Sequence, residues 1–138
     1  MNTKNNQQQR LSKRWIITII LLFTGFGASA QEWTNWTIWK STCYQVSYRF
    51  REKSITSDKK NIQVELKNNY NHGISISFRI SNSDDADVIY RTDIDAGDTK
   101  IVDGYVDKNR AWHLILGKLR YDGDSYGDAY RGQERCVY

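Results

Sequence analysis

Short stretches of this chain alternate between hydrophobic and polar residues, which is the side-chain period of a β-strand. The clearest stretch begins after Cys43, where every second residue is aromatic or aliphatic: Tyr44, Val46, Tyr48 and Phe50. The residues between them are polar and include Arg49 and Arg51. Aromatic and β-branched residues at a period of two are typical of a strand with one buried face. The same pattern predicts further strands around 62–66, 74–80, 88–94 and 99–106.

The pattern changes in the last predicted strand, around 112–119. Apolar residues occupy both of its faces: Trp112, Leu114, Ile115, Leu116 and Leu119. Apolar residues on both faces indicate a central strand of a sheet. Gly117 interrupts the run, and a glycine inside a strand is typical of a β-bulge.

Segments with turn composition separate these strands. Residues 68–73, Asn-Asn-Tyr-Asn-His-Gly, tolerate positive φ, so we predict a hairpin between the strands around 62–66 and 74–80. Residues 95–98, Asp-Ala-Gly-Asp, predict a second turn. No stretch has a convincing helical period. Six or seven short strands at this spacing favour an all-β fold, a single antiparallel β-sandwich.

The first thirty residues have the three-part order of a secretory signal peptide. Their charged residues are all basic: Lys4, Arg10, Lys13 and Arg14. An apolar run follows at 15–26, and Ala28 and Ala30 are the small residues that signal peptidase needs. The run is shorter than the ~20 residues that span a bilayer. We therefore expect cleavage before Gln31, leaving a secreted or periplasmic domain, 31–138, outside the membrane; the alternative is an uncleaved anchor.

Removing this leader changes the charge balance of the protein. The whole chain has 20 Lys and Arg against 16 Asp and Glu, and without the four basic leader residues the numbers are equal. The exported domain therefore lacks the net-basic footprint of nucleic-acid binding. Residues 40–67 nevertheless hold seven bases and three acids, whereas 84–107 hold eight acids and two bases. We expect these faces to neutralise each other across the fold; the alternative is a docking surface.

Cys43 and Cys136 are the two cysteines of the chain. Export favours an oxidising compartment, so we predict a single disulfide between them. Closing so long a loop stabilises a small domain by about 4 kcal/mol in the chain-entropy model. The bond also removes both thiols as nucleophiles or metal ligands.

Three tryptophans at a spacing of three, Trp33, Trp36 and Trp39, precede Cys43 by a few residues. This pattern resembles the opening of a thrombospondin type 1 repeat. The resemblance implies that the indoles stack in layers with arginines of a neighbouring strand, here Arg49 and Arg51, and that the module binds glycosaminoglycans or other extracellular partners. The chain departs from that family because it lacks the second cysteine motif, and two cysteines cannot form the family's three bridges.

The tryptophan segment can also be interpreted from its residue pattern alone, without reference to any family. We expect it to pair as a further edge strand, in which Trp33 and Trp39 share one side and Trp36 faces the other. At least one indole would then belong to the core, and an exposed one would suit the apolar face of a sugar or a protein partner. The candidate ligand-binding residues are Trp33, Trp36, Trp39, Arg49 and Arg51.

The sequence contains few other candidates for a metal-binding or catalytic site. Asp122, Asp124 and Asp128 alternate along a Gly-bent loop and form a candidate calcium site, although a solvated acidic turn has the same composition. Neither His72 nor His113 is accompanied by a recognisable nucleophile and orienting acid, so we expect no catalytic residues and no cofactor.

The leader and the Lys- and Asn-rich domain resemble the small secreted domains common in bacteria of the Bacteroidetes type, a resemblance that implies no activity. We expect a non-catalytic extracytoplasmic binding or adhesion module with an extracellular glycan or protein as its ligand. The alternatives are a subunit of an envelope assembly and a secreted enzyme or enzyme inhibitor.

Overall fold

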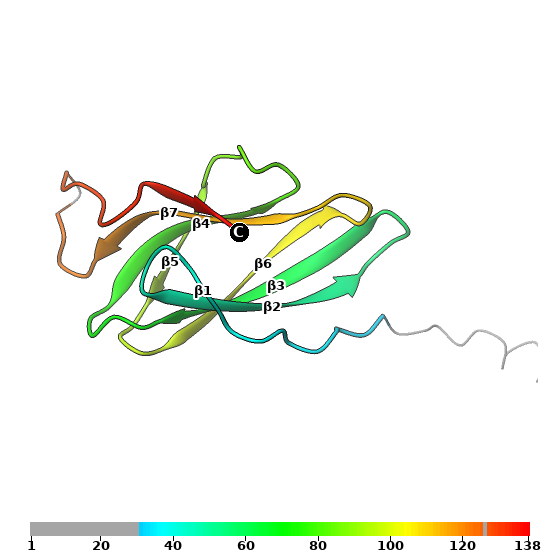
Figure 1. The fold of residues 1–138 in the computed structure, drawn as a ribbon, viewed down its shortest axis with the longest axis horizontal. Helices are drawn as coiled ribbons and strands as arrows, with labels where there is room; N and C mark the ends of the chain where they lie inside the picture. Colours follow the sequence, from blue (N-terminus) through cyan, green and yellow to red (C-terminus); the bar gives the residue numbers. More distant parts are fainter. Residues whose placement is uncertain (1–30, 126) are drawn as a thin grey trace, which may run out of the picture. The chain divides into compact units, whose positions relative to one another are not determined.

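The computed structural model describes residues 31–125 and 127–138, so the predicted leader lies outside the described residues. The described chain forms these strands: β1 (Lys40–Ser41), β2 (Val46–Ser54), β3 (Lys59–Asn68), β4 (Ile74–Ser81), β5 (Tyr90–Ile94), β6 (Thr99–Asp107), β7 (His113–Tyr121) and β8 (Arg135–Val137). They make two antiparallel sheets, ordered β1-β2-β3-β6 and β5-β4-β7-β8, which form the two layers of Figure 1. The predicted all-β sandwich is confirmed. β1 and β8 were not predicted because two or three residues show no alternation.

The alternating residues of both sheets meet in one core. Its fully buried aliphatic side chains come from both layers: Val46, Ile62, Val64 and Leu66 from one, and Ile74, Ile76, Leu114, Leu116 and Leu119 from the other. Side chains at a period of two on each sheet face the partner sheet, as in other sandwiches. The polar residues of the same strands consequently lie on the outer faces.

The predicted hairpin at 68–73 is wrong. β3 pairs with β2 and β6, whereas β4 pairs with β5 and β7, so the chain crosses from one sheet to the other in this segment. The buried Asn68 stabilises the segment that crosses between the sheets, because its side-chain amide donates to the carbonyls of His72, Ile94 and Asp95 at 2.9–3.0 Å. Asn and Gly residues allow the chain to bend, but the bend serves a sheet-to-sheet connection.

The hairpin that positions the candidate site joins β2 and β3. Its register runs without a break from Val46 opposite Asn68 to Ser54 opposite Lys60. Opposite residues of an antiparallel pair point to the same face of the sheet. On the outer face, Arg49 is therefore paired with Glu65, and Arg51 with Gln63.

β7 is a central strand of its sheet, as predicted, and it contains a bulge. The register with β4 shifts between Ser75 and Ser77, opposite the residues that follow Gly117. Lys118 adopts a φ of 52° there, a conformation that few non-glycine residues take. The freed Lys118 carbonyl accepts a hydrogen bond from Arg91 at 3.2 Å. The bulge predicted at Gly117 is confirmed, with its distorted residue one position later.

The predicted disulfide between Cys43 and Cys136 is present, with a Cα–Cα distance of 6.4 Å. Cys43 precedes β2 in one sheet and Cys136 lies in β8 of the other, so the bond fastens the two layers together. A disulfide indicates an oxidising compartment. Within the described part of the chain, no helix is long and apolar enough to cross a membrane.

Candidate ligand-binding surface

The tryptophan segment lies along the side of β2 that faces away from β3, where β1 continues it, but it is not the predicted edge strand. Thr34 and Thr37 make the contacts: their amides donate to the carbonyls of Glu52 and Phe50 at 2.8 and 2.9 Å. Their hydroxyls accept from the amides of the same two residues, at 2.9 and 3.0 Å. A strand would pair at every second residue, whereas these contacts recur at every third. This is the period of a polyproline II helix.

The period of three places the tryptophans differently from our prediction. Trp33, Trp36 and Trp39 all lie beside the outward-facing arginines of β2, so the expected alternation of sides is wrong. None of the three belongs to the core. Trp39 is 39 % exposed, and the other two are half-buried.

Indole rings and guanidinium groups alternate in one row, which we call the tryptophan–arginine stack (Trp33, Trp36, Trp39, Arg49 and Arg51). The guanidinium carbon of Arg49 lies 4.7 Å from the Trp39 ring centre and 5.1 Å from that of Trp36. That of Arg51 lies 4.6 Å from Trp36 and 4.9 Å from Trp33. These distances are within the range of cation–π attraction.

A third cation from the same face of β2 ends the row. The ammonium of Lys53 lies 5.9 Å from the ring centre of Trp33. Alternate residues of a strand are about 6.6 Å apart, which leaves room for one aromatic ring between successive cations. The matching of these two periods, two along β2 and three along the tryptophan segment, produces the stack.

β3 holds the arginines from the opposite side. The Nε of Arg49 donates to a Glu65 carboxylate oxygen at 2.5 Å, and the Nε of Arg51 donates to the Gln63 amide oxygen at 2.9 Å. Within residues 31–125 and 127–138, the Nη atoms of neither arginine have a protein acceptor. Arg49 therefore has a fixed counterion, whereas Arg51 has a neutral partner and keeps its positive charge uncompensated by a direct contact.

The candidate calcium residues do not assemble around one point. Arg131 binds the Asp124 carboxylate at 2.7 Å, and this bond, with one from the Tyr121 amide, lowers the pKa of Asp124 to about 2. Asp128 accepts from the Ser125 amide at 2.7 Å, and Asp122 lies against Gly73. Among the described residues, no group of three or more His, Cys, Asp or Glu is placed to hold a metal ion.

The two histidines lie apart from each other. His72 packs edge-on against Tyr121, with ring centres 4.0 Å apart, and stacks on Tyr70 at 5.6 Å. Tyr121 is the last residue of β7, whereas His113 is the first, so His113 lies at the opposite end of β7 from this contact. His72 thus takes part in an aromatic cluster.

The two charged segments form few ion pairs with each other. In the described part of the chain, only the pair between Lys59 and Asp107 joins 40–67 to 84–107. The expected mutual neutralisation is therefore not achieved by ion pairs, and most carboxylates of 84–107 form no ion pair with another described residue.

The residues that hold or extend the stack were not identified by the sequence analysis. Thr34 and Thr37 each follow a tryptophan, so the repeat of Trp-Thr pairs could have revealed a period of three. Glu65 and Gln63 could be assigned only once the β2–β3 register was known, and Lys53 continues the alternation of Arg49 and Arg51.

Comparisons with known proteins identify no relative of this chain. No protein-family model matches the chain, and the searches of curated proteins and of solved structures find no significant match. The assignment of a function therefore depends on the physical chemistry of the site.

Proposed function

We propose that this protein is a non-catalytic binding or adhesion module that acts outside the cytoplasm, and that the tryptophan–arginine stack is its contact surface. The observation that carries the proposal is the row of partly exposed indoles and cations on the outer face of the β1-β2-β3-β6 sheet. The disulfide and the predicted leader support an extracytoplasmic location.

The stack differs from a simple aromatic platform for sugars. Trp36 has a guanidinium on each side, and Trp33 lies between Arg51 and Lys53, so the faces of these rings are already occupied. A ligand would meet indole edges alternating with guanidinium Nη groups. Only Trp39, at the end of the row, has a cation on one side alone among the described residues.

This arrangement favours an acidic ligand. Guanidinium groups bind carboxylates and sulfates in paired hydrogen bonds, and the surrounding rings hold them in place. Cations at regular spacing along β2 suit a polymer with repeated charges. The favoured ligand is therefore an acidic extracellular glycan, and a protein with an acidic surface is the alternative ligand.

Retention on immobilised polysaccharides tests this function. The panel would contain chondroitin sulfate, polygalacturonate, neutral dextran and cell-envelope fractions. We expect the protein to bind the acidic polymers more strongly than dextran, with retention that falls as salt rises. The double variant Arg49→Gln, Arg51→Gln should lose that retention, whereas Arg79→Gln on the other sheet should keep it. Absence of retention on every member of the panel, or equal retention of the double variant, would contradict the proposal.

A further inference from the structure

A pocket with a volume of about 500 Å³ lies on the outer face of the β5-β4-β7-β8 sheet, which is the sheet that does not carry the stack. This volume is within the range of small-molecule sites. Ser75 and Ser77 of β4 line the pocket, with Arg91 of β5 on one side and Lys118 and Arg120 of β7 on the other. The pocket therefore has cations on both sides of two hydroxyl groups.

The bulge in β7 brings Lys118 to this pocket. Leu114 and Leu116 belong to the core, and a regular alternation would direct Lys118 to the core as well. The extra residue shifts the alternation by one position, so Leu119 enters the core instead. Lys118 then lines the pocket with a φ of 52°, which is unfavourable for a residue other than glycine. Residues in such strained conformations cluster at functional sites.

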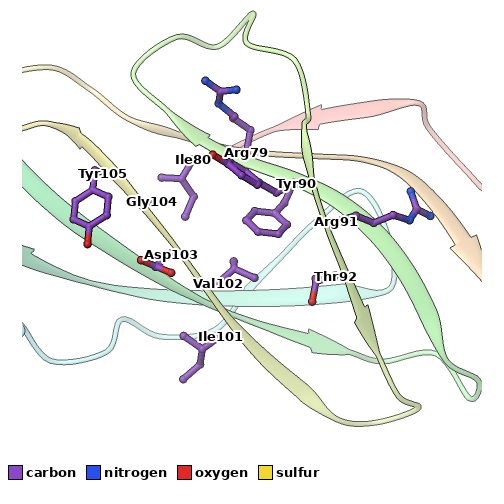
Figure 2. A pocket seen from close by; sticks show the side chains of 11 residues that line it. Arg79, Ile80, Tyr90, Arg91, Thr92, Ile101, Val102, Asp103, Gly104 and Tyr105 are labelled. Carbon is purple, nitrogen blue, oxygen red and sulfur yellow. The ribbon is translucent and has the colours of Figure 1, made fainter.

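Arg91 prepares the two serine hydroxyls to bind an anion. Its Nε donates to the Ser75 Oγ at 2.7 Å, and an Nη donates to the Ser77 Oγ at 3.0 Å. Its other bonds go to the carbonyls of Ser75 and Lys118. In Figure 2, which views the groove between β5 and β6, the guanidinium of Arg91 points away from the side chains of β6. A hydroxyl that accepts from Arg91 keeps its own proton, which it can donate to a ligand.

Two carboxylates also line the pocket, and their surroundings differ. Asp124 is neutralised by Arg131, whose Nη lies 2.7 Å from the carboxylate. Asp122 forms no ion pair with another described residue. An ionised carboxylate of this kind only accepts hydrogen bonds, and hydroxyl groups can supply them. Asp122 therefore favours a ligand that carries hydroxyl groups beside its charge.

Positive charge exceeds the remaining negative charge in the lining. Arg91 and Lys118 form no ion pair with another described residue. Asp93 shares the outer face of β5 with Arg91 but is not part of the lining, and Asp87 and Glu134 border a separate, smaller pocket beside Lys118. Three cations of the lining thus face one carboxylate that has no ion pair. A concave surface with this excess attracts anions.

We propose that this pocket binds a small acidic sugar, with its oxyanion between Lys118, Arg120 and the serine hydroxyls. The hydroxyl groups of the sugar donate to Asp122. The ring of Tyr130, 37 % exposed and 4.9 Å from the guanidinium carbon of Arg120, offers an apolar surface to the sugar ring. A carboxylate, a sulfate or a phosphate would each provide the oxygen acceptors. The site is separate from the tryptophan–arginine stack, and the proposal does not depend on binding there.

Titration of the purified protein, followed by its amide NMR signals, tests the proposal. The ligands would be glucuronate, glucose 6-sulfate and glucose 6-phosphate, with glucose and inorganic sulfate as controls at equal ionic strength. We expect at least one acidic sugar to shift the signals of Ser75, Ser77 and Lys118. It should bind about tenfold or more tightly than either control, because a hydrogen bond to a charged group is worth at least that factor. The acidic sugar that binds best identifies the preferred oxyanion.

Lys118→Gly separates a binding role of this residue from a structural one. Glycine adopts a positive φ without strain, so the melting temperature should equal or exceed that of the wild type. Acidic-sugar binding should nevertheless weaken about tenfold or more. Arg79→Gln, on the same strand as the serines, and Arg51→Gln in the stack should bind as the wild type does. The proposal is overturned if no acidic sugar binds, if glucose or inorganic sulfate binds as tightly, if the shifts map outside the pocket, or if Lys118→Gly retains full binding.

Discussion

The guanidinium carbon of Arg51 lies 4.6 Å from the ring centre of Trp36, although the two residues belong to segments that are not paired as strands. The contact exists because Thr34 and Thr37 fasten the tryptophan segment to β2 at every third residue. Removing these hydrogen bonds should therefore affect the indoles without touching the core.

Thr37→Val tests this dependence. The substitution keeps the shape of the side chain but removes the acceptor of the Phe50 amide, a loss of about 1 kcal/mol. We expect iodide to quench tryptophan fluorescence more strongly in the variant, because the segment detaches more often. Thr99→Val, at the exposed start of β6, is the control. Unchanged quenching in Thr37→Val would show that the cation–π contacts alone hold the segment.

Asn68 is expected to matter more for stability than any other residue of the β3–β4 connection. Asn68→Asp keeps its size but replaces the buried donor with an acceptor that faces three carbonyls. We expect the free energy of unfolding to fall by about 3 kcal/mol or more. The neighbouring Asn69→Asp, whose side chain binds only Ser47 at an exposed position, should change it by less than about 0.5 kcal/mol. Urea denaturation would measure both; equal effects would contradict the role of Asn68.

The disulfide should contribute a large share of the stability. Replacing Cys43 and Cys136 with Ser should lower the free energy of unfolding by about 4 kcal/mol, because the unfolded chain regains the freedom of a long loop. Non-reducing mass spectrometry of the wild type should show one linked peptide pair. A double variant that melts at the wild-type temperature would refute this estimate.

Alkaline pH should destabilise the protein through Tyr44. Burial, with Tyr138 and Tyr70 nearby, raises the pKa of Tyr44 to about 12 from its ordinary value of 10. A raised folded-state pKa means that the folded protein holds its proton longer than the unfolded chain. Stability is therefore complete below about pH 10 and falls as pH rises to about 12.

Tyr44→Phe provides the test of that pH dependence. The variant loses the hydrogen bond from the Tyr44 hydroxyl to the Gln133 carbonyl, so it should be less stable at pH 8. Its melting temperature should then fall less steeply between pH 10 and 12. Some slope should remain, because burial also raises the pKa of Tyr48 and Tyr70. An equally steep fall in the variant would exclude Tyr44 as the main cause.

The sequence predicted the strands of this fold and their buried faces better than the connections between the strands. Residues such as Val64 and Ile76 alternate with polar neighbours, and this local pattern determines both the strand and its buried face. The partner of each strand depends on contacts distant in sequence, so the hairpin expected at 68–73 could not be distinguished from a crossing between sheets. The role of Asn68 could not be predicted locally, because its buried side chain binds the carbonyls of Ile94 and Asp95, which lie some 26 residues later in the chain.

The candidate site was predicted in its components and not in its geometry. The spacing of Trp33, Trp36 and Trp39 was visible, but the assumption of a strand period placed Trp36 on the wrong side. The period of three arises from the threonine contacts with β2, which no local propensity describes. The positions of Arg49 and Arg51 followed correctly from alternation, because β2 is a regular strand.

Indole NMR during titration with chondroitin sulfate oligosaccharides tests the proposed binding surface most directly. Trp112, whose Nε1 donates to Glu52 at 2.9 Å and whose ring packs on Phe50, serves as an internal reference. We predict that the indole signals of Trp33, Trp36 and Trp39 shift in the wild type while that of Trp112 stays in place. Arg51→Gln should weaken the titration about tenfold, or about 1.4 kcal/mol, and Arg79→Gln should leave it unchanged. Shifts confined to residues outside the stack, or no shift at saturating oligosaccharide, would contradict the account.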